Sequence, residues 1–459
     1  MLSFLRRSVP GAGTDLRKNS PNGLVPLPAV TSPVRVGVLG CGNVGAALVG
    51  LLTDEGDAIE ARTGLRLEVA RVAVRNVSKE RPVQLADGVL TNDAASVVND
   101  PSIDVIVEMI GGIEPARTLI LDALKNGKPV VTANKELLAN VGSDLFAAAD
   151  AAGRDLLFEA AVAGGIPIIR PLRESLVGER ITRIMGIVNG TTNYILTKMS
   201  EEGAAYGDAL AEAQSLGYAE RDPTADVEGY DAGAKAAILA SIAFGKAVVA
   251  GDVYHEGISG VTVDDIAFAH RLGYEVKLLA IADQGDDGRI AVRVHPTMLP
   301  KEHPLASVRD SFNAVFIEGE AVGQLMFYGR GAGGMPTGSA VLGDLIDAAV
   351  NLRRGAHASV GSLPRASIRP IDEVRSEYYL NLEVADRPGV LHAVSGVFAE
   401  HGVSIRSMEQ EPLADSNVGA RLVFITHDAA ESAVQATLHD LRQLDVVTTV
   451  TSVLRVVGS

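Results

Sequence analysis

The sequence contains only one cysteine among its 459 residues, Cys41. A single thiol excludes an intramolecular disulfide framework and fits a reducing compartment, so we expect a cytoplasmic protein. Long apolar runs are also absent: none reaches the ~18 residues that a membrane-spanning helix needs. The chain has no excess of positive charge either. Its formal net charge of -16 argues against nucleic acid and against an anionic membrane surface as partners.

The length and the hydrophobic content allow several domains. A chain of 459 residues corresponds to about three domains, and a hydrophobic content of 47% suffices for their cores. Residues 1–32 are rich in Gly, Pro, Ser and Asn and include a few basic side chains. The apolar stretch at 2–5 is too short for a signal peptide, so we expect a disordered tail rather than a targeting sequence.

From residue 34 onward, short apolar strands alternate with helical patterns. A strand at 34–39 is followed by a Gly-rich turn and by a helix that starts near Val44. Further strands are predicted at 67–74, 103–109, 129–132 and 155–159, and helices at 114–125 and 145–152. Strands that alternate with helices indicate a parallel sheet. We therefore predict an α/β fold that begins with a Rossmann-type domain at 33–164, to which a segment near 330–350 returns.

The rest of the chain is predicted to hold two further domains. Residues 165–351 mix apolar helices with strands such as 181–188 and 290–295, which indicates an α+β domain. Residues 352–375 are rich in Gly, Ser, Pro and Arg, a composition typical of a linker. The segment 376–459 has strands at 378–384, 403–411, 418–426 and 446–456, with helices at 390–400 and from Ala429. This β-α-β-β-α-β order predicts a ferredoxin-like module.

The segment Gly40-Cys41-Gly42-Asn43-Val44-Gly45 lies between the first strand and the first helix. It matches G-x-G-x-x-G, in which the glycines permit a tight turn, a close approach to a pyrophosphate, and helix–strand packing. Because strand, spacing and helix agree, we predict a dinucleotide site formed by Gly40, Gly42, Asn43, Val44 and Gly45, with Cys41 in a packing role. The alternative is a Gly-rich turn in an unrelated α/β domain.

The end of the second predicted strand bears on the choice of cofactor. A site specific for NAD usually offers an acid there to the ribose 2′-hydroxyl. This chain has Arg75 instead, with Lys79 close by, and a cation favours the 2′-phosphate of NADP. We therefore expect NADP, and NAD stays open because a solvated surface arginine is the plain alternative.

Four further turns carry residues suited to ligands. Lys135 follows the fourth predicted strand, where ligands of an open parallel sheet lie, although a surface lysine is the simpler interpretation. Glu159 precedes small residues that either present carbonyl oxygens to a hard cation or form a tight turn with Pro167 at a helix start. Residues 189–194 cap a helix and could present amides to a substrate, and 331–337 either closes over the cofactor or is only a flexible loop.

An acidic segment precedes the most informative lysine. Five carboxylates lie within a dozen residues, at Glu220, Asp222, Asp226, Glu228 and Asp231. Lys235 follows Asp231 at i+4, so in a helix the two side chains share a face. A hydride transfer from a nicotinamide to a carbonyl needs a proton donor, and Lys235 is the candidate. The alternatives are a solvated charged loop and an Asp231 that only caps a helix.

Together these segments resemble the monofunctional homoserine dehydrogenases that have a C-terminal ACT domain. The resemblance covers about residues 34–456 and rests on 40–45, 132–135, 159–167, 189–194, 216–235 and 331–337. Residues 386–391, Asp-Arg-Pro-Gly-Val-Leu, resemble the first turn of an ACT domain. The resemblance implies NAD(P)H-dependent reduction of L-aspartate 4-semialdehyde to L-homoserine, in threonine, methionine and isoleucine biosynthesis. It also implies that 165–351 is a catalytic and dimerisation domain.

The resemblance further implies roles for individual residues. Lys235 is similar to the acid–base residue of the family, and Lys135 to a lysine near cofactor and substrate. The residues implied to bind the substrate are Glu220, Asp226, Asp231, Gly190 and Thr191, and those implied to bind the cofactor are Gly217 and Gly333. The resemblance also implies a site for a monovalent cation, with sodium expected, formed by Glu159 and the carbonyls of Val162, Gly164 and Ile166.

Two other functions compete with this interpretation. An amino-acid-sensing regulatory protein with an inactive dehydrogenase domain would be favoured by loss of Lys235 or by a broken glycine pattern, and both are intact. A 2-hydroxyacid dehydrogenase commonly uses a His base with an Arg for the substrate carboxylate, and no such constellation is clear.

The ACT resemblance implies inhibition by L-threonine through 386–391, in a homodimer or homotetramer. The alternative is a module that only assists oligomerisation.

Overall fold

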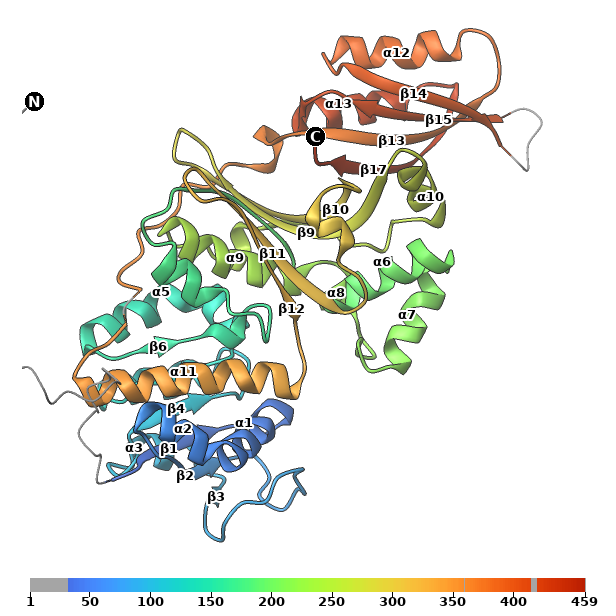
Figure 1. The fold of residues 1–459 in the computed structure, drawn as a ribbon. Helices are drawn as coiled ribbons and strands as arrows, with labels where there is room; N and C mark the ends of the chain where they lie inside the picture. The colour runs from blue at the N-terminus through green and yellow to red at the C-terminus, as the bar shows by residue number, and fades with distance from the viewer. Residues whose placement is uncertain (1–31, 359, 414–418, 459) are drawn as a thin grey trace, which may run out of the picture.

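The computed structural model describes residues 32–358, 360–413 and 419–458, and Figure 1 shows how successive parts of the chain follow one another in space. The predicted tail at 1–32 lies outside the described residues except for Ser32, and so does Val418 at the start of a predicted strand. In the described ranges, no helix combines the length and the apolar character that crossing a bilayer requires.

The N-terminal part holds a six-stranded sheet. Its strands are β1 (Val34–Leu39), β2 (Leu67–Ala73), β3 (Leu90–Thr91), β4 (Val105–Glu108), β5 (Val130–Thr132) and β6 (Leu156–Leu157). They lie in the order β3-β2-β1-β4-β5-β6, and every neighbouring pair is parallel. This is the strand order of dinucleotide-binding sheets, so the predicted Rossmann-type sheet is confirmed.

Helices cover both faces of this sheet. They are α1 (Asn43–Asp54), α2 (Gly56–Thr63), α3 (Ala94–Asn99), α4 (Ala116–Lys125), α5 (Lys135–Ala152) and, from much later in the chain, α11 (Gly334–Arg354). Figure 1 shows the orange α11 beside the blue N-terminal elements. Val341 and Leu345 of α11 share a buried cluster with Val36 and Leu48. The late helix therefore completes the core of the first domain.

The middle part is an antiparallel sheet with helices on one face. The strands are β7 (Ile181–Ile187), β9 (Tyr274–Gln284), β10 (Ile290–Pro300), β11 (Phe312–Gly319) and β12 (Gly323–Arg330), in the order β12-β11-β7-β9-β10. The other elements are α6 (Gly190–Glu202), α7 (Tyr206–Ser215), α8 (Thr224–Val227), α9 (Tyr230–Phe244), the short strand β8 (Tyr254–His255) and α10 (Val263–Arg271). Leu278 and Ala280 of β9 pack in one cluster with Leu239 of α9, as period-2 strands under a helix require.

The C-terminal part has the predicted ferredoxin-like order. Its elements are β13 (Arg375–Ala385), α12 (Val390–Glu400), β14 (Ile405–Pro412), β15 (Gly419–Thr426), β16 (Ala429–Ala430), α13 (Glu431–Leu441) and β17 (Val447–Val456). One connection was not predicted: β17 pairs in parallel with β10, with Arg455 opposite Thr297. The sheets of the middle and C-terminal parts are therefore continuous, as Figure 1 shows.

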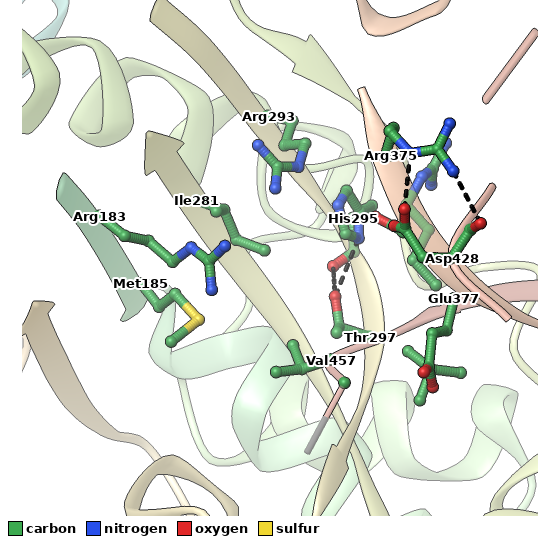
Figure 2. A pocket seen from close by; sticks show the side chains of 14 residues that line it. Arg183, Met185, Ile281, Arg293, His295, Thr297, Arg375, Glu377, Asp428 and Val457 are labelled. Carbon is green, nitrogen blue, oxygen red and sulfur yellow. Dashed lines mark hydrogen bonds and ion pairs between the residues drawn. The ribbon is translucent and has the colours of Figure 1, made fainter. Parts of the chain in front are cut away.

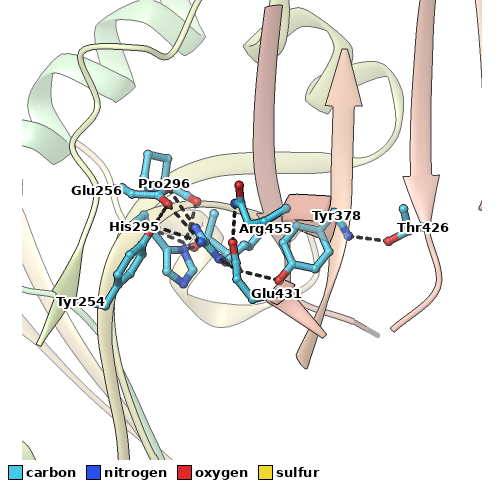
Figure 3. Close-up of polar contacts among 10 residues, drawn as sticks. Tyr254, Glu256, His295, Pro296, Tyr378, Thr426, Glu431 and Arg455 are labelled. Carbon is cyan, nitrogen blue, oxygen red and sulfur yellow. Dashed lines mark hydrogen bonds and ion pairs between the residues drawn. The ribbon is translucent and has the colours of Figure 1, made fainter. Parts of the chain in front are cut away.

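Buried polar contacts strengthen this junction. Arg455, which is 4% exposed, donates from Nε to Glu431 Oε2 and from Nη1 to Glu256 Oε2, both at 2.9 Å. The Tyr378 hydroxyl also donates to Glu431 Oε2, at 2.7 Å. Figure 3 shows Arg455 between the two glutamates. Because a buried charge must be paired, these contacts fix the C-terminal part against the sheet of the middle part.

Several predicted boundaries need correction. The strand expected at 155–159 is only β6, because Glu159 begins a 3-10 turn, Glu159–Ala161. The helix expected from Ala429 begins at Glu431, since residues 429–430 pair with β13. Helix α11 continues to Arg354, inside the predicted linker, because Gly355 provides its left-handed C-terminal cap.

Candidate active site

The Gly-rich loop lies where the parallel sheet reverses its strand order, between β1 and β4. Gly40 has φ +99°, and a Cβ there would lie 2.6 Å from the carbonyl oxygen of Met109. A Cβ at Gly45 would lie 2.6 Å from the carbonyl oxygen of Gly40, so α1 approaches the strand end closely. Gly42 precedes α1 and has open space at its Cβ position. The loop therefore offers an accessible helix N-terminus that suits a pyrophosphate.

Glu108, at the end of β4, is fully buried and holds the adjoining turns. Its Oε1 accepts a hydrogen bond from the Ile110 N–H at 2.7 Å, and its Oε2 accepts one from the Thr132 hydroxyl at 2.6 Å. Asn134 then caps α5 by accepting from the Leu137 N–H at 3.1 Å. These contacts fix the start of α5, whose first residue is Lys135.

Asp231 is the centre of a cluster built from three elements. Helix α9 places Lys235 on the same face as Asp231, as the i+4 spacing predicts, with Nζ 2.7 Å from Oδ2. Lys135 of α5 donates to Oδ1 of the same carboxylate. Asn189, the cap of α6, donates to Oδ2 at 2.8 Å. In the described part of the chain this carboxylate accepts from no backbone N–H, so Asp231 does not act as a helix cap.

Burial and charge set the protonation of this cluster. The Lys235 side chain is 11% exposed, and its Nζ also donates to the carbonyl oxygen of Val188 at 2.7 Å. Burial lowers the pKa of Lys235, and the Asp231 carboxylate opposes this effect. Burial would raise the pKa of Asp231, but the charges of Lys235 and Lys135 outweigh it and hold that pKa well below its usual range. Lys235 therefore reaches its neutral form more readily than a free lysine.

Asn189 is a site residue that the sequence analysis treated only as part of a cap. Its Oδ1 does cap α6, accepting from the Thr192 N–H at 2.9 Å. Its Nδ2 also bridges two carboxylates, donating to Asp231 and, at 2.7 Å, to Asp226. Burial raises the pKa of Asp226. An asparagine at a strand end offers both donor and acceptor, but its partners lie 37 and 42 positions away, so only the fold reveals the second role.

The other predicted substrate residues lie around this cluster with different degrees of contact. Gly190 and Thr191 begin α6, directly after Asn189. The Thr191 hydroxyl donates to the Tyr218 carbonyl oxygen at 2.7 Å and so ties α6 to the loop that contains Gly217. Glu220 lies farther along that loop and is exposed. Within the described residues, its carboxylate contacts no member of the cluster.

Glu159 points its carboxylate at the turn that follows it. Oε1 accepts from the Ile168 N–H at 2.5 Å and the Ile169 N–H at 2.6 Å, and Oε2 accepts from the Arg170 N–H at 2.9 Å. The Glu159 N–H donates to buried Asp344, whose pKa burial raises to about 7. The side chain thus caps the next helical turn, which matches the tight-turn alternative.

The loop after Glu159 has unusual backbone geometry. Ala163 has φ +55°, a left-handed conformation that non-glycine residues seldom adopt. Among the described hydrogen bonds, none ends on the carbonyl oxygens of Val162, Gly164 or Ile166. No three His, Cys, Asp or Glu side chains of the described chain are grouped to hold a metal ion. A cation here would therefore need backbone carbonyls as ligands.

Gly333 and Arg75 are the remaining residues that the sequence analysis expects near the cofactor. Gly333 has φ +121° and precedes α11, and a Cβ at Gly334 would lie 3.2 Å from the carbonyl oxygen of Asn43. The loop 331–337 therefore lies against the start of α1. Arg75 follows β2 and is exposed, without an ion-pair partner in the described residues.

Family models match most of the chain. The model described as "Homoserine dehydrogenase, NAD binding domain" matches residues 40–159, "Homoserine dehydrogenase" matches 167–346, and "ACT domain" matches 378–446. The homoserine dehydrogenase of Mycobacterium tuberculosis (strain ATCC 25618 / H37Rv) is 49% identical over 94% of this chain and 100% of its own length. That of Corynebacterium glutamicum is 50% identical over 92% and 96%.

Solved structures agree with these matches. A homoserine dehydrogenase from Thiobacillus denitrificans has a TM-score of 0.87 and 43% identity, covering 93% of this chain and 99% of that one. A hyperthermophilic archaeal homoserine dehydrogenase in complex with NADPH has a TM-score of 0.61 and 31% identity, covering 70% of this chain and 98% of that one. The similarity therefore extends over all three parts of the fold.

Proposed function

This chain belongs to the homoserine dehydrogenase family, and we propose that Lys235 is the residue that exchanges a proton with its substrate. The enzyme is an NAD(P)-dependent oxidoreductase that interconverts L-aspartate 4-semialdehyde and L-homoserine, and it has an ACT domain. One observation carries the proposal: Asp231 holds Lys235 and Lys135 together at the meeting of the cofactor domain and the catalytic sheet.

The hydrogen bonds of Lys235 suit an acid–base role. A bound NAD(P)H supplies the hydride that reduces the aldehyde carbon. An ammonium has three protons, and Lys235 uses two of them for Asp231 and the Val188 carbonyl. The third can go to the substrate oxygen as negative charge develops there. In the oxidation of homoserine, the neutral amine of Lys235 accepts the hydroxyl proton.

The surrounding charges suit an amino-acid substrate. The substrate carries an α-ammonium, which we assign to the carboxylates of Asp226 and Glu220, with Asp231 holding the lysines. Its α-carboxylate needs donors, and we assign these to Lys135 and to the amides of Gly190 and Thr191 at the start of α6. Glu220 is exposed, so its assignment requires the Gly217 loop to approach the bound substrate.

Replacement of Lys235 tests the central assignment. Lys235→Met keeps the apolar stem and removes the proton donor, so kcat should fall about 10²- to 10⁴-fold while NADPH still binds. Lys246→Met, just beyond the same helix, is the matched control, because among the described residues the Lys246 ammonium donates only to the Gly288 carbonyl. Turnover is followed by NADPH absorbance with aspartate semialdehyde, and NADPH binding by calorimetry. A wild-type kcat in Lys235→Met would remove this residue from the chemistry.

NADP is the cofactor that we propose this enzyme prefers. Gly40, Gly42, Asn43, Val44 and Gly45 would hold the pyrophosphate. Gly217 and Gly333 would border the rest of the cofactor. Arg75 is exposed, unpaired within the described chain, and follows β2, where a cation can meet the 2′-phosphate. The archaeal relative whose complex contains NADPH supports this preference.

A monovalent cation, sodium by preference, is proposed for the loop after Glu159. The strained Ala163 and the unbonded carbonyls of Val162, Gly164 and Ile166 support it. Of the three backbone N–H groups that bind the Glu159 carboxylate, only that of Arg170 donates to Oε2 in the described chain. Oε2 therefore keeps one lone pair for a cation. Turnover is compared in sodium and in tetramethylammonium chloride at equal ionic strength. Loss of activity in tetramethylammonium is expected, and equal rates would exclude a catalytic need for the small cation.

We also propose how the enzyme is organised and regulated. L-Threonine is the proposed effector, bound at the turn 386–391 where Gly389 precedes α12 with φ +93°. The proposed assembly is a homodimer or homotetramer through residues 165–351 and paired ACT domains. The proposed domains are 33–164 with a returning segment near 330–350, 165–351 and 376–459, and the proposed location is the cytoplasm.

A further inference from the structure

A cavity of about 290 Å³ lies between the catalytic sheet and the ACT domain, away from the Lys235 cluster. Figure 2 shows Arg183 and Met185 of β7 on one side of it, and Arg375 with Asp428 on the other. His295 of β10 lies between these two groups in the same view. None of these residues takes part in the proposed chemistry.

The polar lining follows from the register of β10. Residues alternate along a strand, and Val292 and Val294 face the helices in the main core cluster. Arg293, His295 and Thr297 occupy the opposite face, and all three are buried, with exposures of 6%, 1% and 1%. This polar face is therefore enclosed in the fold, where Arg455 of the ACT domain lines the same cavity.

Two buried donors or acceptors on this face have no partner in the described structure. They are Arg293 Nε and His295 Nε2. One other atom of each side chain is engaged: Arg293 Nη1 donates to Asp283 at 2.5 Å, and His295 Nδ1 lies 2.9 Å from the Thr297 hydroxyl. Buried polar groups are nearly always hydrogen-bonded, so these two atoms indicate a guest in the cavity.

The charged side chains on the wall have partners, but Arg183 and Arg293 keep N–H donors that no described residue uses. Both acids are taken: Asp428 pairs with Arg375, and Glu377 pairs with Arg406, each at 2.6 Å. Arg183 has only a distant carboxylate, Glu318 at 3.7 Å. Arg183 lies on β7 and Arg293 lies on β10. These two strands flank β9 on either side, near Ile281. Two guanidinium groups therefore face the cavity with donors to spare.

We propose that this cavity binds one small oxyanion, a carboxylate or phosphate of about amino-acid size, between Arg183 and Arg293 with His295 beside it. Guanidinium groups bind both kinds of oxyanion through paired N–H donors. The apolar side chains of Met185 and Ile281 leave room for a short carbon chain. Arg455, which also lines the cavity, holds Glu256, so the site lies at the joint between the regulatory and catalytic parts.

Binding to the full-length enzyme tests the proposal. Calorimetric titrations use inorganic phosphate and malonate as separate probes, with NADPH saturating so that the cofactor site is filled. We expect one saturable site per chain for at least one probe. The probe that binds more tightly distinguishes a phosphate site from a carboxylate site.

Variants locate that site. Arg183→Gln should weaken the binding about tenfold or more, the loss typical of one charge-assisted hydrogen bond. Arg183 is 43% exposed on its side chain, so the variant should fold, and its melting temperature verifies this. Arg180→Gln is the matched control, because Arg180 precedes the same strand and pairs with Glu320 outside the cavity. Absence of saturable binding up to about 10 mM, or equal binding by wild type and Arg183→Gln, would overturn the proposal.

Discussion

Asp231→Asn should separate the two directions of the reaction. The change keeps the shape of the side chain and removes the charge that Lys235 and Lys135 share. Burial already lowers the pKa of Lys235, and the carboxylate 2.7 Å away is the main influence that opposes it. Without that carboxylate, the positive charge of Lys135 remains and acts in the same direction as burial. The pKa of Lys235 should therefore fall further.

The sign of the effect follows from which form each direction needs. Reduction of the aldehyde needs the Lys235 ammonium, which exists below its pKa, so the reductive rate should begin to fall at a lower pH than in the wild type. At a pH above the pKa of Lys235 in both enzymes, each unit by which this pKa falls removes about nine-tenths of the ammonium form. The reductive rate should then fall about tenfold per unit. Oxidation of homoserine needs the neutral amine, so its rising limb should also move to lower pH.

The assay follows NADPH absorbance in both directions from about pH 6 to about pH 10. The expected result is a parallel displacement of both profiles toward acid, which slows reduction and relatively favours oxidation at one fixed pH. Asp222→Asn is the control, since Asp222 lies in the same acidic segment, is exposed, and accepts from the Thr224 hydroxyl rather than from Lys235. Profiles that match the wild type, or equal losses in both directions at every pH, would refute this account of the cluster.

Four other outcomes follow from the same geometry. Glu220→Gln should raise the KM for homoserine several-fold with little effect on NADPH binding, and unchanged steady-state kinetics would remove Glu220 from the site. Arg75→Ala should raise the KM for NADPH about tenfold and leave that for NADH almost unchanged, whereas equal effects would exclude a 2′-phosphate role. Gly389→Ala should weaken threonine inhibition at unchanged kcat, while Gly396→Ala in the same helix, with open space at its Cβ, should not. Gly40→Ala should abolish cofactor binding or folding, because its Cβ would lie 2.6 Å from a carbonyl oxygen; normal NADPH affinity would contradict the tight turn.

Point variants are a better test of regulation than removal of the ACT domain. Truncation after residue 370 would also remove β17, which pairs with β10, and Arg455, which holds Glu256. A truncated enzyme could therefore lose activity for reasons unrelated to threonine.

The sequence by itself determined the parts of the protein that depend on short spacings. Glycines at 40, 42 and 45 after a buried strand predict the cofactor turn, because only a few neighbouring residues decide that geometry. The i+4 spacing of Asp231 and Lys235 likewise predicts their contact once the segment is helical. Alternation of apolar residues predicted the sheets, and it erred mainly at element ends, as at Glu159.

Only the tertiary structure decided which distant residues meet. Lys135 reaches Asp231 across 96 positions, and Asn189 joins Asp226 to Asp231, because strand order and packing bring these chain segments together. The carboxylate of Glu159 serves three backbone amides that its sequence context does not reveal. His295 is 1% exposed on β10, the strand with which β17 from the end of the chain pairs. Local periodicity contains no information on such contacts, since they depend on how whole elements bury their apolar faces together.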